Sequence, residues 1–291
     1  PFPLPPAPAF ADGIWVSNEK DDTISVIDIE SLEVVRTIDV GERPRGITFS
    51  KDFSVLYVCA SDSDTVQVID PETGEVLHEL PSGEDPEQFV LHPDDRHLYI
   101  ANEDDAITTL VDTQTRKVVA QIDGGIEPEG MAVSPDGKIA ITTSETTNMA
   151  HWIDTEKQEL FANTLVDSRP RHAEFIKDGS ELWVSAEIGG TISIFDVASQ
   201  TEKAKIHFDF QGVHPARVPT VGFALPSRDH HPPATTGTLH PLAGADVVTV
   251  VVYYYILARR RVWHLYFSAG RQIFIRTKCR VGESPLPAAS R

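Results

Sequence analysis

Short apolar runs alternate with clusters of polar, turn-forming residues along most of the chain. In one representative stretch the runs cover residues 46–49, 55–60, 65–70 and 75–80. Each run is rich in β-branched and aromatic residues and is bounded by Asp, Gly, Pro or Ser, which is typical of a β-strand. No run shows the sustained i, i+3, i+4 apolar spacing of an amphipathic helix. The pattern therefore predicts strands joined by tight turns, and no α-helix.

This four-run unit recurs with a period of 42 residues. The aspartate that closes the third run recurs at Asp28, Asp70, Asp112, Asp154 and Asp196. A large apolar residue in the second run recurs at Trp15, Tyr57, Tyr99, Ile141 and Trp183. A proline opens the unit at Pro44, Pro86, Pro128 and Pro170. Independent landmarks that share one period identify a repeat protein.

A repeat of about 40–45 residues with four antiparallel strands is one blade of a β-propeller. Runs such as LYV at 56–58 and LWV at 182–184 are apolar on both faces of the strand. A sheet of this kind has to pack against a neighbour on each side, and a ring of blades satisfies every sheet. Second-run positions fall at 15, 57, 99, 141, 183, about 233 and 275. We therefore predict an all-β, seven-bladed β-propeller of four-stranded antiparallel blades.

The repeat pattern divides the chain into five segments. Residues 1–11 are apolar and proline-rich and end in AFA, which predicts a signal-peptide remnant or a disordered tail. Residues 12–223 carry blades one to five and the start of blade six. Residues 224–258 lose the blade pattern, and residues 259–276 resume it in register as the start of blade seven. Residues 277–291 leave it again and are expected to be a disordered tail.

The two ends of the repeat array predict an incompletely closed ring. The first blade starts at its second strand, and the seventh blade does not reach the strands that would complete the first. Between residues 224 and 258 the spacing is kept while the sequence is scrambled, which indicates a reading-frame disturbance that later corrects itself. The C-terminal part is therefore expected to be poorly ordered.

The charge of the chain limits its partners. The formal net charge is −19, and most of the excess acid lies in the repeats before residue 217. An acidic body argues against nucleic acid, whose phosphates require a basic surface. The apolar run at 247–258 is shorter than the roughly 20 residues of a membrane-spanning helix. Two distant cysteines, Cys59 and Cys279, give neither a disulfide framework nor a metal motif, and no metal is expected.

Second-run sequences such as WVSN at 15–18 and YVCA at 57–60 resemble the YVTN repeat of bacterial and archaeal propellers. The segments GIWVSNEKDDTISVID, VGERPRGITFS and HFDFQGVHP are similar to exported propellers associated with PQQ-dependent catabolism. The resemblance implies a periplasmic or secreted protein that accompanies quinoprotein alcohol oxidation. It implies as partner a periplasmic quinoprotein dehydrogenase or cytochrome. PQQ enters through the family name alone, and no cofactor is expected.

The period also identifies the loops that meet at one mouth of a propeller. The residue after the repeat proline is charged in four repeats and aromatic in a later one: Arg45, Glu87, Glu129, Arg171 and Trp263. The next position holds His172 and His264, and a neighbouring loop presents Glu19, Glu103, Glu145 and Glu187. This mixed-charge ring has two interpretations. It binds a small charged ligand or a basic loop of a partner, or it is a salt-bridge network that keeps the blades in phase.

Three functions are compatible with these features. The first is a non-catalytic binding or scaffold propeller, favoured by the resemblance and by the lack of a catalytic constellation. The second is a lactonase-type hydrolase, for which Glu103, Glu145, Arg171 and His172 are the catalytic candidates. The third is the non-functional product of a damaged reading frame. A propeller scaffold hosts many functions, so the fold alone does not choose among them.

Overall fold

The computed structural model describes residues 13–28, 31 and 33–207, and the backbone of short strands at 223–224, 247–250, 262–268 and 272–278. The chain divides into two compact units, Pro1–His230 and His231–Arg291. The predictions for residues 1–11, for most of 224–258 and for all of 277–291 except the last two residues of a strand at 272–278 fall outside the described residues.

The first unit contains five four-stranded antiparallel sheets among its described residues. The first sheet has the order β20-β1-β2-β3, with β1 (Gly13–Asn18), β2 (Thr23–Asp28), β3 (Val34–Asp39) and β20 (Phe223–Ala224). The second contains β4 (Pro44–Phe49), β5 (Leu56–Ala60), β6 (Thr65–Ile69) and β7 (Val76–Pro81) in chain order. A 3-10 turn, η1 (Ser61–Ser63), joins β5 to β6.

The remaining sheets of this unit repeat the same chain-ordered meander. The third contains β8 (Pro86–Leu91), β9 (His97–Asn102), β10 (Ile107–Asp112) and β11 (Lys117–Asp123). The fourth contains β12 (Pro128–Val133), β13 (Ile139–Ser144), β14 (Met149–Asp154) and β15 (Glu159–Leu165). The fifth contains β16 (Pro170–Phe175), β17 (Glu181–Ala186), β18 (Thr191–Asp196) and β19 (Thr201–His207).

The second unit contains one three-stranded antiparallel sheet in its described part. Its strands are β21 (Val247–Val250), β22 (Val262–Ser268) and β23 (Gln272–Lys278). Trp263 and His264 lie in β22, and their side chains are outside the description. None of the described residues forms a helix of the length and apolarity that crossing a membrane requires.

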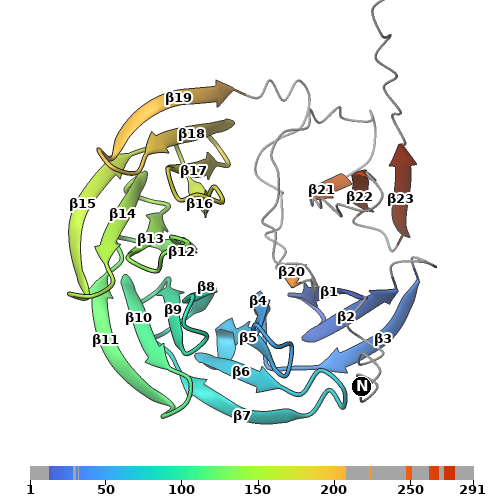
Figure 1. Cartoon of the computed structure of the whole chain (residues 1–291). Coiled ribbons are helices and arrows are strands. Elements are labelled where there is room, and N and C mark those ends of the chain that lie inside the picture. Colours follow the sequence, from blue (N-terminus) through green and yellow to red (C-terminus); the bar gives the residue numbers. More distant parts are fainter. Residues whose placement is uncertain are drawn as a thin grey trace, which may run out of the picture. The chain divides into compact units, whose positions relative to one another are not determined.

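The sheets of the first unit follow one another in sequence order along an open arc, with the first strand of each on the concave side (Figure 1). The repeat landmarks occupy equivalent places in this arrangement. Each large apolar residue of the second run pairs with the residue 11 positions later: Trp15 with Val26, Tyr57 with Val68, Tyr99 with Leu110, Ile141 with Trp152 and Trp183 with Ile194. The prediction of an all-β propeller with four-stranded blades is confirmed.

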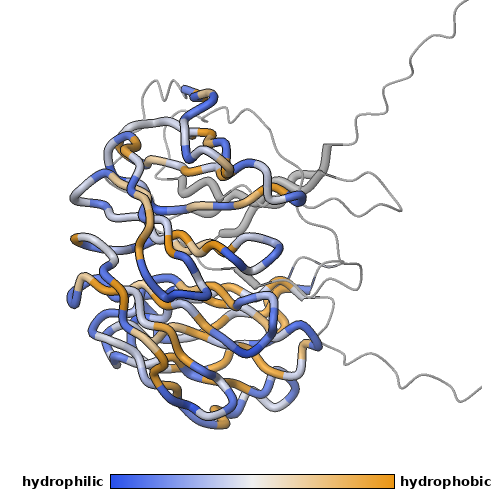
Figure 2. The backbone as a smooth tube through the Cα atoms, turned by 60° about the vertical axis from the view of Figure 1, so that its left-hand side comes forward, coloured by the Kyte–Doolittle hydropathy of each residue, from blue (hydrophilic) through white to orange (hydrophobic). Residues whose placement is uncertain are grey.

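The hydrophobic core lies between the blades rather than inside one of them. Trp15 and Val26 of the first sheet pack with Leu56 and Ile69 of the second in one buried cluster. Similar clusters join the second sheet to the third, the third to the fourth and the fourth to the fifth. Apolar segments of the tube accordingly lie along the strands, while the turns at their ends are mostly hydrophilic (Figure 2). Stacking of two-sided apolar sheets therefore holds this unit together.

The fifth sheet differs from the others in the burial of its aromatic residue. Trp15, Tyr57, Tyr99 and Ile141 are buried against the following blade, whereas Trp183 is only partly buried. Strand β17 alternates between buried and partly buried positions, as expected when one face of a sheet is covered. No core cluster of the described residues joins the fifth sheet to the first. The predicted incomplete closure is confirmed for this part of the chain.

The first blade, however, does not lack an inner strand. Strand β20 pairs antiparallel with β1, with Trp15 opposite Ala224 and Val16 opposite Phe223. This short strand follows Gly222, which corresponds by the repeat to Gly46 in the inner strand of the second blade. An inner-strand sequence from the sixth repeat thus satisfies the open edge of β1. The expectation that nothing would supply this strand is wrong.

Removing one interblade aromatic should destabilise the protein strongly. Trp152 is fully buried, packs edge-on to Phe195 at a centroid distance of 6.3 Å, and donates from Nε1 to Thr164. We expect Trp152→Ala to lower the free energy of unfolding by about 3–5 kcal/mol, because it leaves a cavity between two blades. Urea denaturation of the full chain measures this loss.

Phe161→Ala is the matched control. Phe161 contacts the same tryptophan but is 45% exposed. Its replacement should cost much less, on the order of 1 kcal/mol. Equal losses for the two variants would contradict the assignment of the core to the interblade face.

Candidate functional site

The backbone before each repeat proline adopts an uncommon conformation. The residue there has a positive φ in four successive blades: Arg43 (53°), Asp85 (50°), Glu127 (54°) and Arg169 (61°). Non-glycine residues rarely occupy this region, at a cost of about 1–3 kcal/mol each. Such residues persist where their surroundings fix them, and they gather at functional sites.

Hydrogen bonds fix these residues on both sides. Their carbonyl oxygens accept from backbone N–H groups in a loop of the same blade, at Ser61, Glu103, Glu145 and Glu187 respectively. The N–H groups of Arg43, Asp85 and Arg169 donate to side chains of the preceding blade, namely Asp22, Asp64 and Asn148. Each proline-containing segment is thereby held between two blades.

A β-bulge follows each of these prolines and turns the next side chain inward. The register between first and second strands shifts directly after Pro44, Pro86, Pro128 and Pro170. The Nη2 atom of Arg45 lies 2.9 Å from Oε1 of Glu129, although the two residues come from blades that are not adjacent. The inner strands therefore converge. The residues on either side of the prolines meet there with glutamates of the neighbouring loops, and we call this group of residues the mouth cluster.

The first arginine pair of the mouth cluster belongs to the second blade. Arg43 lies 2.8 Å from Asp85, 2.7 Å from Glu87 and 3.3 Å from Glu19. Arg45 is paired with Glu87 and Glu129, and its Nη1 lies 3.3 Å from Glu19. The side chain of Arg45 is only 5% exposed, and those of Glu87 and Glu129 are completely buried.

The second arginine pair belongs to the fifth blade and closes the cluster on the other side. Arg169 lies 2.7 Å from Glu145 and 3.5 Å from Glu187. Arg171 is paired with Glu145 and lies 3.6 Å from Glu129 and 3.4 Å from Glu187. Ion pairs thus connect carboxylates of the first, third, fourth and fifth blades to arginines of the second and fifth.

Burial and crowding of carboxylates change the protonation of this cluster. Burial and the neighbouring Glu129 raise the pKa of Glu87 to about 10, against the opposing effect of Arg45 and Arg43. Burial also raises the pKa of Glu103, although a hydrogen bond from Glu87 partly offsets it. The raised pKa favours a proton on Glu87, and such a proton would reduce repulsion among carboxylates that outnumber the arginines beside them.

The structure brings together most of the residues that the period had indicated. Glu19, Arg45, Glu87, Glu103, Glu129, Glu145, Arg171 and Glu187 all belong to the mouth cluster. His172 is exposed on β16, and no described contact joins it to those acids. The residues directly before the repeat prolines were not among the site residues predicted from the sequence. Their signal was the periodic series RPR at 43–45, DPE at 85–87, EPE at 127–129 and RPR at 169–171.

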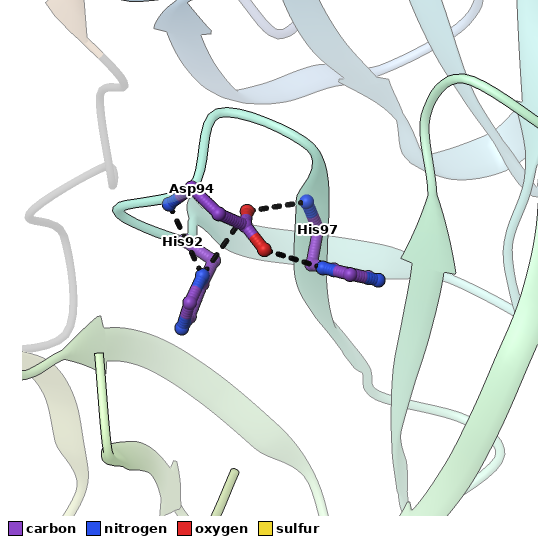
Figure 3. A group of neighbouring side chains, drawn as sticks. All are labelled: His92, Asp94 and His97. Atoms are coloured by element: carbon purple, nitrogen blue, oxygen red, sulfur yellow. Dashed lines mark hydrogen bonds and ion pairs between the residues drawn. The ribbon is translucent and has the colours of Figure 1, made fainter. Parts of the chain in front are cut away.

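A second group of potential ligands lies at the opposite end of β8, in the hairpin to β9. His92 Nδ1 is 3.0 Å from Asp94 Oδ1, and His97 Nδ1 is 2.6 Å from Asp94 Oδ2 (Figure 3). One potential ligand atom from each residue lies within 4.8 Å of the others. Partial burial raises the pKa of Asp94, but hydrogen bonds from His97 and from the backbone N–H of Arg96 outweigh it and hold the pKa well below its usual value.

A cavity of about 270 Å³ adjoins this group between the third and fourth blades. Its walls include the three hairpin residues and, from the neighbouring turns, Gly137 and Thr155. No metal was expected from the sequence, and none of these three residues was among the predicted site residues. The available signal was the pattern H-x-D-x-x-H at 92–97, in which histidines occupy positions held by Ser134 and Ile139 one repeat later.

The comparisons with known proteins agree with this architecture. The model of the YNCE-like beta-propeller family matches residues 47–216, more than half of the chain. The chain belongs to the YNCE-like β-propeller family. The model of the seven-bladed β-propeller lactonase family matches residues 11–82. Comparison with curated proteins gave no match.

A solved structure with a similar chain is that of hydrazine synthase from Kuenenia stuttgartiensis. The two chains are 29% identical, with a TM-score of 0.54, over 56% of this chain and 49% of the other. The match therefore covers about half of that chain. Within the YNCE-like match lie Glu87, Glu129 and Arg171, together with the hairpin at 92–97. The lactonase match contains Glu19, Arg43 and Arg45 instead.

The raised pKa of Glu87 predicts a specific pH dependence of stability. The unfolded chain releases this proton near 4.5, whereas the folded chain retains it up to about 10. The stabilisation is therefore complete below pH 4.5 and is lost as the pH rises towards 10. In the unmodified chain, this proton lowers the free energy of unfolding by about 4 kcal/mol between pH 5.5 and 8.5, and we expect Glu87→Gln to remove that decrease.

Urea midpoints at the two pH values measure the change. Glu84→Gln, an exposed neighbour in the same blade, is the control and should keep the slope of the unmodified chain. Identical pH slopes for Glu87→Gln and the unmodified chain would show that Glu87 is ionised in the folded state.

Proposed function

We propose that this chain is a non-catalytic, exported propeller that binds a partner in PQQ-dependent alcohol catabolism through its acidic mouth end. The partner is a periplasmic quinoprotein dehydrogenase or cytochrome with a basic surface. The observation that carries the proposal is the pairing of all four mouth arginines with carboxylates. This pairing leaves the surrounding exposed carboxylates to determine the charge of that end.

Exposed acids are concentrated on the loops around the mouth cluster. They are Asp21, Asp22, Glu42, Asp62, Asp64, Glu84, Asp104 and Asp105. These loops connect strands whose ends carry the mouth residues, so their charges lie on one end of the first unit. A surface of one sign accelerates the encounter with an oppositely charged partner and selects against partners of the same sign.

The arginines of the mouth cluster are poorly placed for catalysis. Arg171 is held by Glu129, Glu145 and Glu187, and Arg45 is buried between Glu87 and Glu129. A guanidinium in such a network is already neutralised by protein carboxylates, so it is not available to stabilise a developing negative charge. The geometry supports binding in preference to turnover.

A lactonase-type hydrolase is the second candidate, favoured by the family match over residues 11–82. Its candidate residues are Glu103, Glu145, Arg171 and His172. Three of them share the mouth cluster, whereas His172 is exposed outside it. Turnover of a lactone panel by the full chain, lost on Glu145→Gln but not on Glu84→Gln, would favour this function over binding.

The binding proposal predicts a strongly salt-dependent interaction. Calorimetric titration of the full chain with a basic c-type cytochrome, and with a periplasmic quinoprotein alcohol dehydrogenase, should give binding that weakens as ionic strength rises. The triple variant Glu42→Gln, Glu84→Gln, Asp104→Asn should weaken binding about tenfold, because it removes three exposed charges at the mouth end.

The triple variant Glu33→Gln, Glu72→Gln, Glu75→Gln is the charge-matched control. It removes three exposed carboxylates from turns at the opposite end of the blades. The affinity should stay within about twofold of that of the unmodified chain. No binding to either partner at low salt, or an equal effect of both triple variants, would refute the proposal.

A further inference from the structure

The hairpin between β8 and β9 contains more than its fold requires. In the corresponding turns, Asp52, Asp136 and Asp178 each accept a backbone N–H two residues ahead. Asp94 forms the same turn by accepting from the N–H groups of Arg96 and His97. The other turns form without histidine, so His92 and His97 are not needed to shape this one.

The hydrogen bond on the far side of His92 determines which ring nitrogen faces the group. His92 Nε2 lies 2.9 Å from the carbonyl oxygen of Gly137, which can only accept, so Nε2 carries the proton. In the neutral ring Nδ1 then carries a lone pair instead of a proton. This lone pair accepts a long hydrogen bond from the backbone N–H of Asp94, at 3.2 Å. This lone pair lies 3.0 Å from Asp94 Oδ1, another acceptor.

Two acceptors at this separation repel unless a proton or a metal ion lies between them. A histidine whose outer N–H is held by a backbone carbonyl is also the usual arrangement of a metal ligand, because that bond fixes the ring orientation. The third member, His97, directs Nδ1 at the same carboxylate from the start of β9 (Figure 3). Three ligand atoms thus converge from one short hairpin.

We propose that His92, Asp94 and His97 form a binding site for a divalent transition metal of the zinc class. Two imidazole nitrogens and one carboxylate oxygen are a donor set that suits Zn²⁺, whereas Ca²⁺ and Mg²⁺ prefer oxygen ligands alone. Three protein ligands leave a fourth position for water or a small oxygen ligand. The 270 Å³ cavity that all three residues line provides the space for it.

This site is separate from the proposed partner-binding end. Glu87 is the second residue of β8 and His92 follows its last residue, so the two lie roughly 16 Å apart at the rise of a β-strand. Asp85, Glu87 and Glu103 form another carboxylate group with closely spaced oxygens. Two of its members are already occupied, because Arg43 pairs with Asp85 and Arg45 pairs with Glu87. The hairpin is therefore the better metal site.

Zinc titration of the full, untagged chain tests the proposal. After removal of metals with a chelator, Zn²⁺ is added in competition with a chromophoric indicator. We expect one equivalent to bind, with affinity at least tenfold lower in His92→Gln, in His97→Gln and in Asp94→Asn. Cobalt(II) in place of zinc should give visible absorption bands of a low-symmetry site, and the same variants should abolish them.

Three control variants separate this site from other zinc binding. His78→Gln removes a histidine outside the group, Asp136→Asn alters the equivalent turn without histidines, and Glu103→Gln alters the mouth cluster. All three should keep the affinity of the unmodified chain. Circular dichroism melting shows that each variant is folded. The proposal is overturned if the unmodified chain binds no zinc at micromolar concentration, or if the hairpin variants bind it as tightly as the controls.

Discussion

The packing of each sheet against the next is the interaction on which the described architecture depends. A single blade has apolar residues on both faces. Each of the four buried clusters lies between two neighbouring blades. An aromatic side chain buried in such a contact removes about 150–250 Å² from water. At roughly 25 cal/mol per Å², each contributes several kcal/mol. Stability is therefore shared between neighbours, as in other repeat proteins.

Convergence of the inner strands follows from this packing and creates the charged mouth. Wedge-shaped stacking brings residues from non-adjacent blades, such as Arg45 and Glu129, within hydrogen-bonding distance. Charges forced together and away from water have to be paired, and such pairs rarely increase net stability. The network has a different consequence, since it connects all five blades of the first unit and fixes the backbone segments with positive φ. It thereby holds the loop ends that carry the exposed acids of the proposed binding surface.

The two ends of the blades carry different chemistry because different loops form them. At the mouth end, the residues around the repeat proline are arginine pairs in the second and fifth blades and acid pairs in the third and fourth, so the outer two blades neutralise the inner two. At the other end, one aspartate per turn is enough to close the hairpin. The turn at 92–97 is the exception, and its added histidines indicate a role beyond the turn itself.

Much of this protein could be read from its sequence. The 42-residue period, the strand positions, the turn aspartates and the two-sided apolar runs are local patterns, and they determined the blade and its stacking. The period even indicated most of the mouth cluster, because equivalent positions in a ring face one axis. Strands and turns are specified by a few adjacent residues, and their repetition is visible along the chain, so both could be recognised without coordinates.

Other features were decided only when distant segments met. The contact of Arg45 with Glu129, the raised pKa of Glu87 and the hydrogen bond from His92 to Gly137 each depend on residues from different blades. The pairing of β20 with β1 likewise joins the sixth repeat to the first. Hydrogen bonds and pKa values depend on distance and burial, which a periodic sequence does not specify. The chain itself thus determined the repeating sheet, and the tertiary structure determined which of its charged groups and histidines lie together.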